Sequence, residues 1–172
     1  SPLNGGVYID CTFGGGGYSK QLLKFSKTIV KGLDRDSEVK EIGKKLEKKF
    51  PKRFKFHQTT FSKLEDVTEG FVDVILFDLG LSSIQLNDLK RGFSFKSNEK
   101  LDMSMGLNKF SAQEVVNNLS ELELKLVIKI FGEEKEAGKI AKNIVKFRNK
   151  KKITKVKELV DIIEKSKIKN YA

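Results

Sequence analysis

Residues 9–17, IDCTFGGGG, place one aspartate, Asp10, beside four consecutive glycines, and they are the residues best suited to binding a ligand. Glycine loses more backbone entropy on ordering than any other residue, so a run of four indicates that something approaches the main chain closely. A dinucleotide pyrophosphate often lies against such a turn. The carboxylate of Asp10 would repel that negatively charged ligand. Asp10 therefore distinguishes a ligand with negative charge from one with positive charge.

Two further aspartates end predicted strands, and the alternation of strands and helices explains how they would meet Asp10. Asp34 ends one apolar run and Asp78 ends another. The patterns predict strands over 7–11, 29–34, 54–58 and 71–78, with helices over 17–25 and 37–50. This order predicts an α/β fold with a parallel, doubly wound sheet that binds ligands at the carboxyl ends of its strands. The near-continuous apolar run 71–78 is typical of a strand covered on both faces.

The second half of the chain has a different character. Residues 79–110 are predicted to form an ordered functional loop, because they are apolar but lack periodicity. From residue 111 onward the sequence predicts helices, and SAQE and SELE each have the form of a capping box. We therefore expect two domains, a ligand-binding domain over 1–108 and a helical domain over 109–172.

Composition favours a polyanionic partner. The 172 residues include 34 basic and 23 acidic side chains, for a net charge of +11, and the basic residues are densest over 146–157. Scattered lysines are also common on ordinary solvated surfaces, so charge alone leaves nucleic acid as one of two explanations. The single cysteine, Cys11, excludes an intramolecular disulfide and fits a reducing cytoplasm. No apolar run is long enough to span a membrane, and no signal peptide is expected.

The glycine run does not satisfy the dinucleotide-binding fingerprint. G-x-G-x-x-G requires a third glycine, and the two available registers place Ser19 or Lys20 there. Asp10 and Asp78 would also flank a pyrophosphate, at a cost of several kcal/mol by a Coulomb estimate of order-of-magnitude accuracy. S-adenosylmethionine carries no phosphate and bears a sulfonium and an ammonium group, so carboxylates at the strand ends favour it. A nicotinamide dehydrogenase is therefore the weaker alternative.

Asp34 and Phe61 are candidates for binding the adenosine portion. Asp34 follows Gly14 by 20 positions, the separation expected of an acidic residue that binds ribose hydroxyls. A turn or helix-capping role in LDRDS is the alternative for Asp34. Phe61 is placed to pack near adenine, and ordinary core packing is its alternative.

Other chemistries have little support in the sequence. His57 is the only histidine and falls in a predicted strand, where a hydrogen-bonded or solvent-facing role is more plausible than catalysis. One histidine and one cysteine make no zinc site, and we expect no metal. The phosphate-loop and nucleophile-elbow motifs are both absent from the sequence.

Six motifs in order resemble the MraW/RsmH family of S-adenosylmethionine-dependent methyltransferases, over about residues 5–165. They are DCTFGGGGYS, LDRD, FDLGLSSIQLND, RGFSF, KLDMSMG and FGEEKEAGKIAKNIV. The resemblance implies transfer of a methyl group to the N4 amine of a decoding-centre cytosine in 16S small-subunit ribosomal RNA. It also implies a Rossmann-like class I methyltransferase sheet with a helical inserted domain on the substrate side. A DNA amino-methyltransferase is less similar, because this chain has DLGL where those enzymes usually carry D/N-P-P-Y/F.

Carried over by position, the resemblance implies a set of cofactor-binding residues. Together with Asp10, which the charge argument selects, these are Gly16, Gly17, Tyr18, Asp34, Phe61, Asp78 and Gln85. Asp78 is also the candidate catalytic residue, because a carboxylate or carbonyl that accepts an N4 hydrogen would help localise the amine lone pair. The backbone of the adjoining LGLSS is the alternative acceptor, and a role in cofactor binding alone is the alternative for Asp78. The expected partners are small-subunit ribosomal RNA or the assembled subunit, with no membrane, a cytoplasmic location and a homodimer as one oligomeric state.

The family continues with further strands of the sheet, so the resemblance implies a partial member with an incomplete sheet. An open strand edge is expected next to 71–78. A catalytically inactive, RNA-binding remnant of the family is therefore the alternative function.

Overall fold

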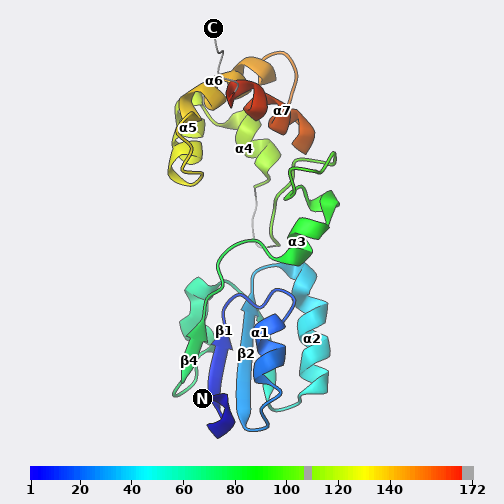
Figure 1. Cartoon of the computed structure of the whole chain (residues 1–172), viewed down its shortest axis with the longest axis vertical. Helices are drawn as coiled ribbons and strands as arrows, with labels where there is room; N and C mark the ends of the chain where they lie inside the picture. The colour runs from blue at the N-terminus through cyan, green and yellow to red at the C-terminus, as the bar shows by residue number, and fades with distance from the viewer. Residues whose placement is uncertain (107–109, 168–172) are drawn as a thin grey trace. The chain divides into compact units, whose positions relative to one another are not determined.

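The computed structural model describes residues 1–106 and 110–167 (Figure 1). The described residues form two compact units. The first consists of Ser1–Ile84 with Met105 and Gly106, and the second consists of Gln85–Ser104 with residues 110–167.

The first unit contains a parallel sheet with strand order β3-β2-β1-β4. Its strands are β1 (Gly6–Asp10), β2 (Thr28–Asp34), β3 (Phe54–Gln58) and β4 (Val74–Leu76). Its helices are α1 (Gly17–Leu22) and α2 (Lys40–Lys49), with 3₁₀ segments η1 (Pro2–Asn4), η2 (Ser37–Val39) and η3 (Phe61–Val67). The predicted α/β fold with a parallel sheet is confirmed. Asp10 pairs with Gly32 and Leu76, so β1, β2 and β4 end at one edge of the sheet.

The two faces of the sheet bury different layers. On one face, α1 and α2 pack side by side over a core that includes Tyr8, Val30 and Phe54 (Figure 1). On the other face, Leu64 and Val67 of η3 pack against Ile9, Cys11 and Leu33. In β1 and β2, alternating side chains therefore enter different cores, as the two-residue period of a strand requires.

The prediction that 71–78 forms a strand covered on both faces is wrong for the described chain. β4 is limited to Val74–Leu76 and lies at the edge of the described sheet, paired with β1 alone. Ile75 and Phe77 are 43% and 51% exposed, and Phe71 is 99% exposed. A run of apolar residues indicates that a segment can be buried. Whether it is buried depends on which other elements of the chain pack against it.

The start of the second predicted helix also differs from expectation. We predicted a helix over 37–50, which Ser37 could cap. The side chain of Asp36 instead accepts a hydrogen bond from the Glu38 backbone, and the 3₁₀ turn η2 precedes α2. Asp36 is fully buried, so tertiary packing determines which of the two adjacent cap-forming residues is used.

The second unit is helical. It contains α4 (Ala112–Asn118), α5 (Glu121–Ile130), α6 (Ala137–Arg148) and α7 (Val156–Lys167), with the 3₁₀ segment η4 (Leu89–Arg91). The short helix α3 (Ser83–Asn87) falls at the division between the units. Both predicted capping boxes are confirmed, Ser111 with Glu114 and Ser120 with Glu123. The core centres on Leu124, Ile140 and Ile144.

The boundary between the units differs from the predicted division after residue 108. Leu101 is buried in the helical core, and its backbone N–H donates to the Thr154 carbonyl. Its carbonyl accepts from Gln113, so this part of the predicted loop is attached to the helices. The assignment of a cofactor domain and a substrate domain stays a prediction.

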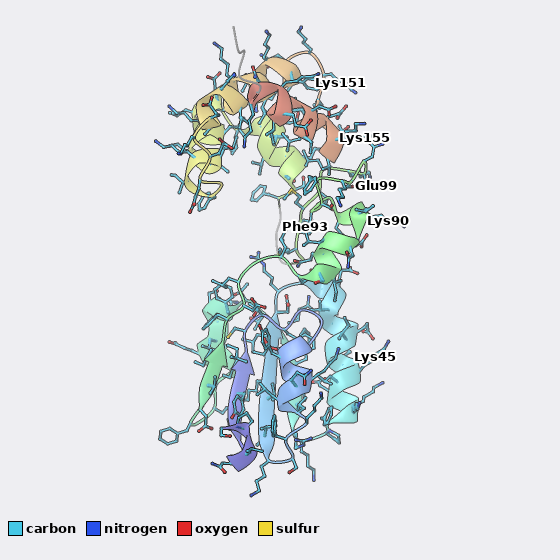
Figure 2. All side chains as sticks on the ribbon, viewed as in Figure 1. Lys45, Lys90, Phe93, Glu99, Lys151 and Lys155 are labelled. Carbon is cyan, nitrogen blue, oxygen red and sulfur yellow. The ribbon has the colours of Figure 1, made fainter. Side chains whose placement is uncertain are left out.

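The Glu158 side chain caps the start of α7, and replacing this residue tests that role. Its carboxylate accepts from the Lys151 ammonium at 2.6 Å and from the backbone N–H groups of Thr154 and Lys155 at 2.9 and 3.1 Å. Figure 2 labels Lys151 and Lys155. The bond from Lys151, followed by those from the backbone, lowers the pKa of Glu158 from 4.5 to about 2. The stability that it contributes is therefore complete above pH 4.5 and is lost as the pH falls towards 2.

Glu158→Gln is expected to lower the free energy of unfolding by about 1 kcal/mol at neutral pH, the usual value of a cap. The difference from the unsubstituted chain should shrink below pH 4.5 and vanish near pH 2. Urea unfolding followed by circular dichroism across this range measures it. Glu164→Gln, at an exposed position of the same helix, is the matched control. A Glu158→Gln deficit that is the same at every pH would contradict the assignment.

Candidate functional site

The glycine turn is held to the sheet by the residue before it, Phe13. Its backbone N–H donates to the Leu33 carbonyl at 2.9 Å, and its ring is 2% exposed. The ring lies 5.6 Å from that of Phe54 and 5.1 Å from that of Phe56, measured between centroids. The Phe13 ring therefore packs between the glycine turn and the sheet, and it positions the turn relative to the strands.

Two of the four glycines are required by the turn itself. Gly14 and Gly16 have φ angles of 49° and 73°, in the left-handed region that glycine adopts without strain. A Cβ on Gly16 would lie 2.8 Å from the Phe13 ring. Part of the glycine signal in the sequence is therefore explained by the fold and does not require a ligand.

Gly17 differs from Gly16 because its missing side chain leaves open space. A Cβ on Gly17 would meet no atom within 4 Å. The neighbouring Tyr18 is 53% exposed. Gly17 and Tyr18 are thus accessible at the start of α1, and no contact with the described protein explains the absent side chain of Gly17.

Asp34 is tied to the glycine turn. Its Oδ2 accepts from the Gly14 backbone N–H at 2.7 Å, and its Oδ1 accepts from the Asp36 N–H at 2.9 Å. The turn role that the sequence left as an alternative is therefore present. A carboxylate has about four acceptor positions, so these two bonds leave capacity for ribose hydroxyls.

Asp10 is enclosed beneath the turn. It is 0% exposed, its Oδ2 accepts from the Ser19 hydroxyl at 2.7 Å, and its Oδ1 accepts from the Thr12 N–H at 3.4 Å. Burial raises the pKa of Asp10 despite these bonds, which act in the opposite direction. The structure thus gives Asp10 a role in connecting β1, the turn and α1. Its direct contact with a cofactor stays a prediction.

Two aromatic rings lie together after the strand ends. Phe61 begins η3 and Phe77 follows β4, and their centroids are 5.7 Å apart with the rings at 89°. They are 47% and 51% exposed, so neither is an ordinary core residue, which was the alternative for Phe61. Sequence reasoning missed Phe77. Its place in the same apolar run as β4 made it look like a buried strand residue.

Asp78 is positioned by its backbone. Its N–H donates to the Thr12 hydroxyl at 2.8 Å, which connects the segment after β4 to the segment after β1. The same two segments approach again where Ser82 lies 3.6 Å from the position of a Gly14 Cβ. Asp78 itself is exposed, so its carboxylate is accessible at this edge of the sheet.

Gln85 is 6% exposed and belongs to the second unit, so its role as a cofactor contact stays a prediction. Nε2 of His57 is buried with no hydrogen-bond partner among the described residues, contrary to the expectation of a hydrogen-bonded or solvent-facing ring. Burial and then Lys31 and Lys55 lower the pKa of His57, so the neutral ring is favoured.

The end of the sheet at which the strands terminate, their carboxyl end, thus combines three kinds of group. Accessible backbone at Gly17, the carboxylates of Asp34 and Asp78, and the rings of Phe61 and Phe77 all follow strand ends in the first unit. This set suits a ligand with an aromatic base, sugar hydroxyls and positive charge. Among residues 1–106 and 110–167, no group of three His, Cys, Asp or Glu side chains is arranged to hold a metal ion.

Comparison with known proteins gives one family. The model described as the MraW methylase family matches residues 1–171. "Ribosomal RNA small subunit methyltransferase H" of Ehrlichia ruminantium (strain Welgevonden) is 42% identical over 180 residues, covering 100% of this chain and 60% of that protein. The protein of the same name from Caldicellulosiruptor saccharolyticus is 46% identical over 165 residues, covering 92% of this chain and 53% of that protein. The chain therefore spans little more than half the length of these relatives.

Proposed function

The chain belongs to the MraW methylase family, and from this premise we propose that its sheet edge binds S-adenosylmethionine for methylation of small-subunit ribosomal RNA. The observation that carries the proposal is the set of carboxylates and half-exposed aromatic rings at the edge where β1, β2 and β4 end. Two relatives are named as small-subunit ribosomal RNA methyltransferases, which agrees with the net charge of +11.

The residues present fit this cofactor. Asp34 binds the ribose hydroxyls while it holds Gly14, and Gly17 admits the cofactor to the backbone. Phe61 packs on the adenine, and the perpendicular ring of Phe77 keeps Phe61 in place. Gly16 and Tyr18 complete the proposed binding set within the first unit. Asp10 acts beneath it as a positioning residue through Ser19.

The proposed acceptor is the N4 amine of a decoding-centre cytosine. The cofactor supplies an electrophilic methyl group, and the protein must hold a poor nucleophile in line with it. The Asp78 carboxylate accepts an N4 hydrogen and so helps localise the nitrogen lone pair. Positioning can contribute up to about 7–11 kcal/mol in well-oriented reactions, so orientation by Asp78 and its Thr12 anchor is central.

The cellular setting follows from the same proposal. The partners are small-subunit ribosomal RNA or the assembled subunit, and the location is the cytoplasm where that subunit is made. In the part of the chain that the structure describes, no helix has the length and apolarity to cross a bilayer. A homodimer stays a prediction.

Calorimetry and methyl transfer test the proposal together. We expect S-adenosylmethionine to bind the 172-residue chain and NADH not to bind. Labelled methyl transfer to small-subunit RNA is the second measurement. Cofactor binding without transfer would favour the inactive RNA-binding alternative, and NADH binding alone would contradict the proposal.

Asp78→Asn tests the catalytic role. It is expected to lower the transfer rate by about 10²-fold, the lower end of general acid–base contributions, with a smaller loss of cofactor affinity from the removed charge. Asp66→Asn, at an exposed position of η3 in the same unit, is the control. An unchanged rate for Asp78→Asn would refute the catalytic role, and an equal loss of cofactor affinity would assign Asp78 to binding alone.

A further inference from the structure

A pocket of about 270 Å³ lies in the helical unit and takes no part in the site described above. Its lining comes from α6, the turn that follows it, and α7. The lining residues are Asn143, Lys146, Phe147, Lys150, Ile162 and Lys165. The lining combines an apolar surface with an amide and three ammonium groups.

The floor of the pocket is held by core packing and hydrogen bonds. Ile162 is 6% exposed and belongs to the helical core, against which the half-buried Phe147 packs. The Asn143 amide donates to the Ser166 hydroxyl at 2.8 Å, and Ser166 donates to the Ile162 carbonyl at 2.6 Å. The amide of Asn143 is therefore anchored through its nitrogen, and Asn143 brings an acceptor oxygen to the lining of the pocket.

The rim of the pocket is positively charged. Lys146, Lys150 and Lys165 are exposed, and none of them forms an ion pair with another described residue. Residues 137–157 contain nine basic and no acidic residues, so the surroundings add to the positive potential. The occupant that matches this rim is an anion with an apolar or aromatic part.

The size of the pocket distinguishes among such anions. A volume of about 270 Å³ is slightly below the range for drug-sized ligands, which suits one nucleobase better than a lipid chain or a peptide segment. An aromatic ring beside lysines is also the combination by which proteins bind single-stranded nucleic acid, with bases stacked on rings and phosphates on cations.

We propose that this pocket binds one unstacked nucleotide of the RNA substrate. The base lies against Phe147 with an amino group donating to the Asn143 oxygen, and the flanking phosphates contact Lys146 and Lys165. The inference rests on the proposed function for the identity of the RNA. It adds a subsite for a second nucleotide besides the methylated one.

Phe147→Leu separates stacking from charge, because leucine keeps apolar bulk without a ring. The probe is a fluorescein-labelled single-stranded RNA oligonucleotide, compared with an abasic oligonucleotide of the same length. We expect roughly tenfold weaker binding of the base-bearing RNA and unchanged binding of the abasic one. Phe131→Leu, at a position 83% exposed beyond α5, is the matched control. Equal effects on the two oligonucleotides, or none, would overturn the assignment.

The lysines are tested by salt dependence, which does not depend on how the core tolerates Phe147→Leu. The double variant Lys146→Gln/Lys165→Gln should reduce the slope of log K against log salt by about 1.4, at about 0.7 for each phosphate contact. Lys45→Gln/Lys48→Gln removes two exposed charges from α2 and should leave the slope unchanged (Figure 2). Equal slopes for the two double variants would refute the phosphate contacts of Lys146 and Lys165.

Cofactor calorimetry on the same variants separates this inference from the proposed function. S-adenosylmethionine should bind all of them as it binds the unsubstituted chain. If neither the unsubstituted chain nor any variant binds S-adenosylmethionine, the proposed function fails. The RNA-binding measurements still test the pocket in that case. If the pocket variants bind RNA normally, the pocket inference fails alone.

Discussion

Asp34→Asn is expected to weaken S-adenosylmethionine binding by about 10²-fold. The carboxylate has two roles, since it holds the Gly14 N–H at 2.7 Å and has acceptor capacity left for the ribose. Asparagine retains one oxygen acceptor but loses the charge and the second oxygen. Hydrogen bonds to charged groups contribute about 1.5–3 kcal/mol each, so weakening two of them accounts for the expected loss.

Calorimetry gives the affinity, and thermal unfolding tells the two roles of Asp34 apart. A purely structural role would lower the melting temperature and leave the affinity of the folded protein near that of the unsubstituted chain. Glu38→Gln, at an exposed position four residues later, is the control for the loss of one negative charge. Full cofactor affinity in Asp34→Asn would contradict the ribose assignment.

Gly16→Ala is expected to lower stability and Gly17→Ala to weaken cofactor binding, although the two glycines are adjacent. Gly16→Ala puts a side chain at a φ of 73° and 2.8 Å from the Phe13 ring. Left-handed strain and overpacking together should cost about 2–4 kcal/mol of folding free energy. A fall of about 5–15 °C in melting temperature follows for a chain of this size.

Gly17→Ala should leave stability nearly unchanged, because its Cβ meets no protein atom within 4 Å. The methyl group would occupy the space through which the cofactor reaches the backbone, so binding should weaken by at least about tenfold, or roughly 1.4 kcal/mol. Differential scanning calorimetry and ligand titration on both variants measure the two effects. Normal cofactor binding by Gly17→Ala would show that the open space is not part of the site.

Local features of the sequence predicted local features of the structure well. The capping boxes at Ser111 and Ser120 formed as expected, because each involves only the backbone and side chain of one helical turn. The strands ending at Asp10 and Asp34 were also placed correctly, since hydrophobic runs and turn residues define them.

Predictions that depended on distant partners were less accurate. The apolar run at 71–78 could not reveal that β4 pairs with β1 alone in the described sheet. Phe77 was missed for the same reason, since its ring meets Phe61 only after the sheet has formed. Leu101 was assigned to the first domain, but its backbone pairs with Thr154 more than fifty residues later.

The sequence by itself determined the fold class and the family, because strand–helix alternation and ordered motifs are properties of the chain order. It also indicated that the turn after Asp10 binds something. Only the tertiary structure decided how the residues of that turn divide their roles. Gly16 lies over the Phe13 ring, Gly17 faces open space, and Asp10 is enclosed beneath them. The position of the Phe13 ring depends on Leu33, Phe54 and Phe56, which lie in later strands, so no local pattern contains this division of roles.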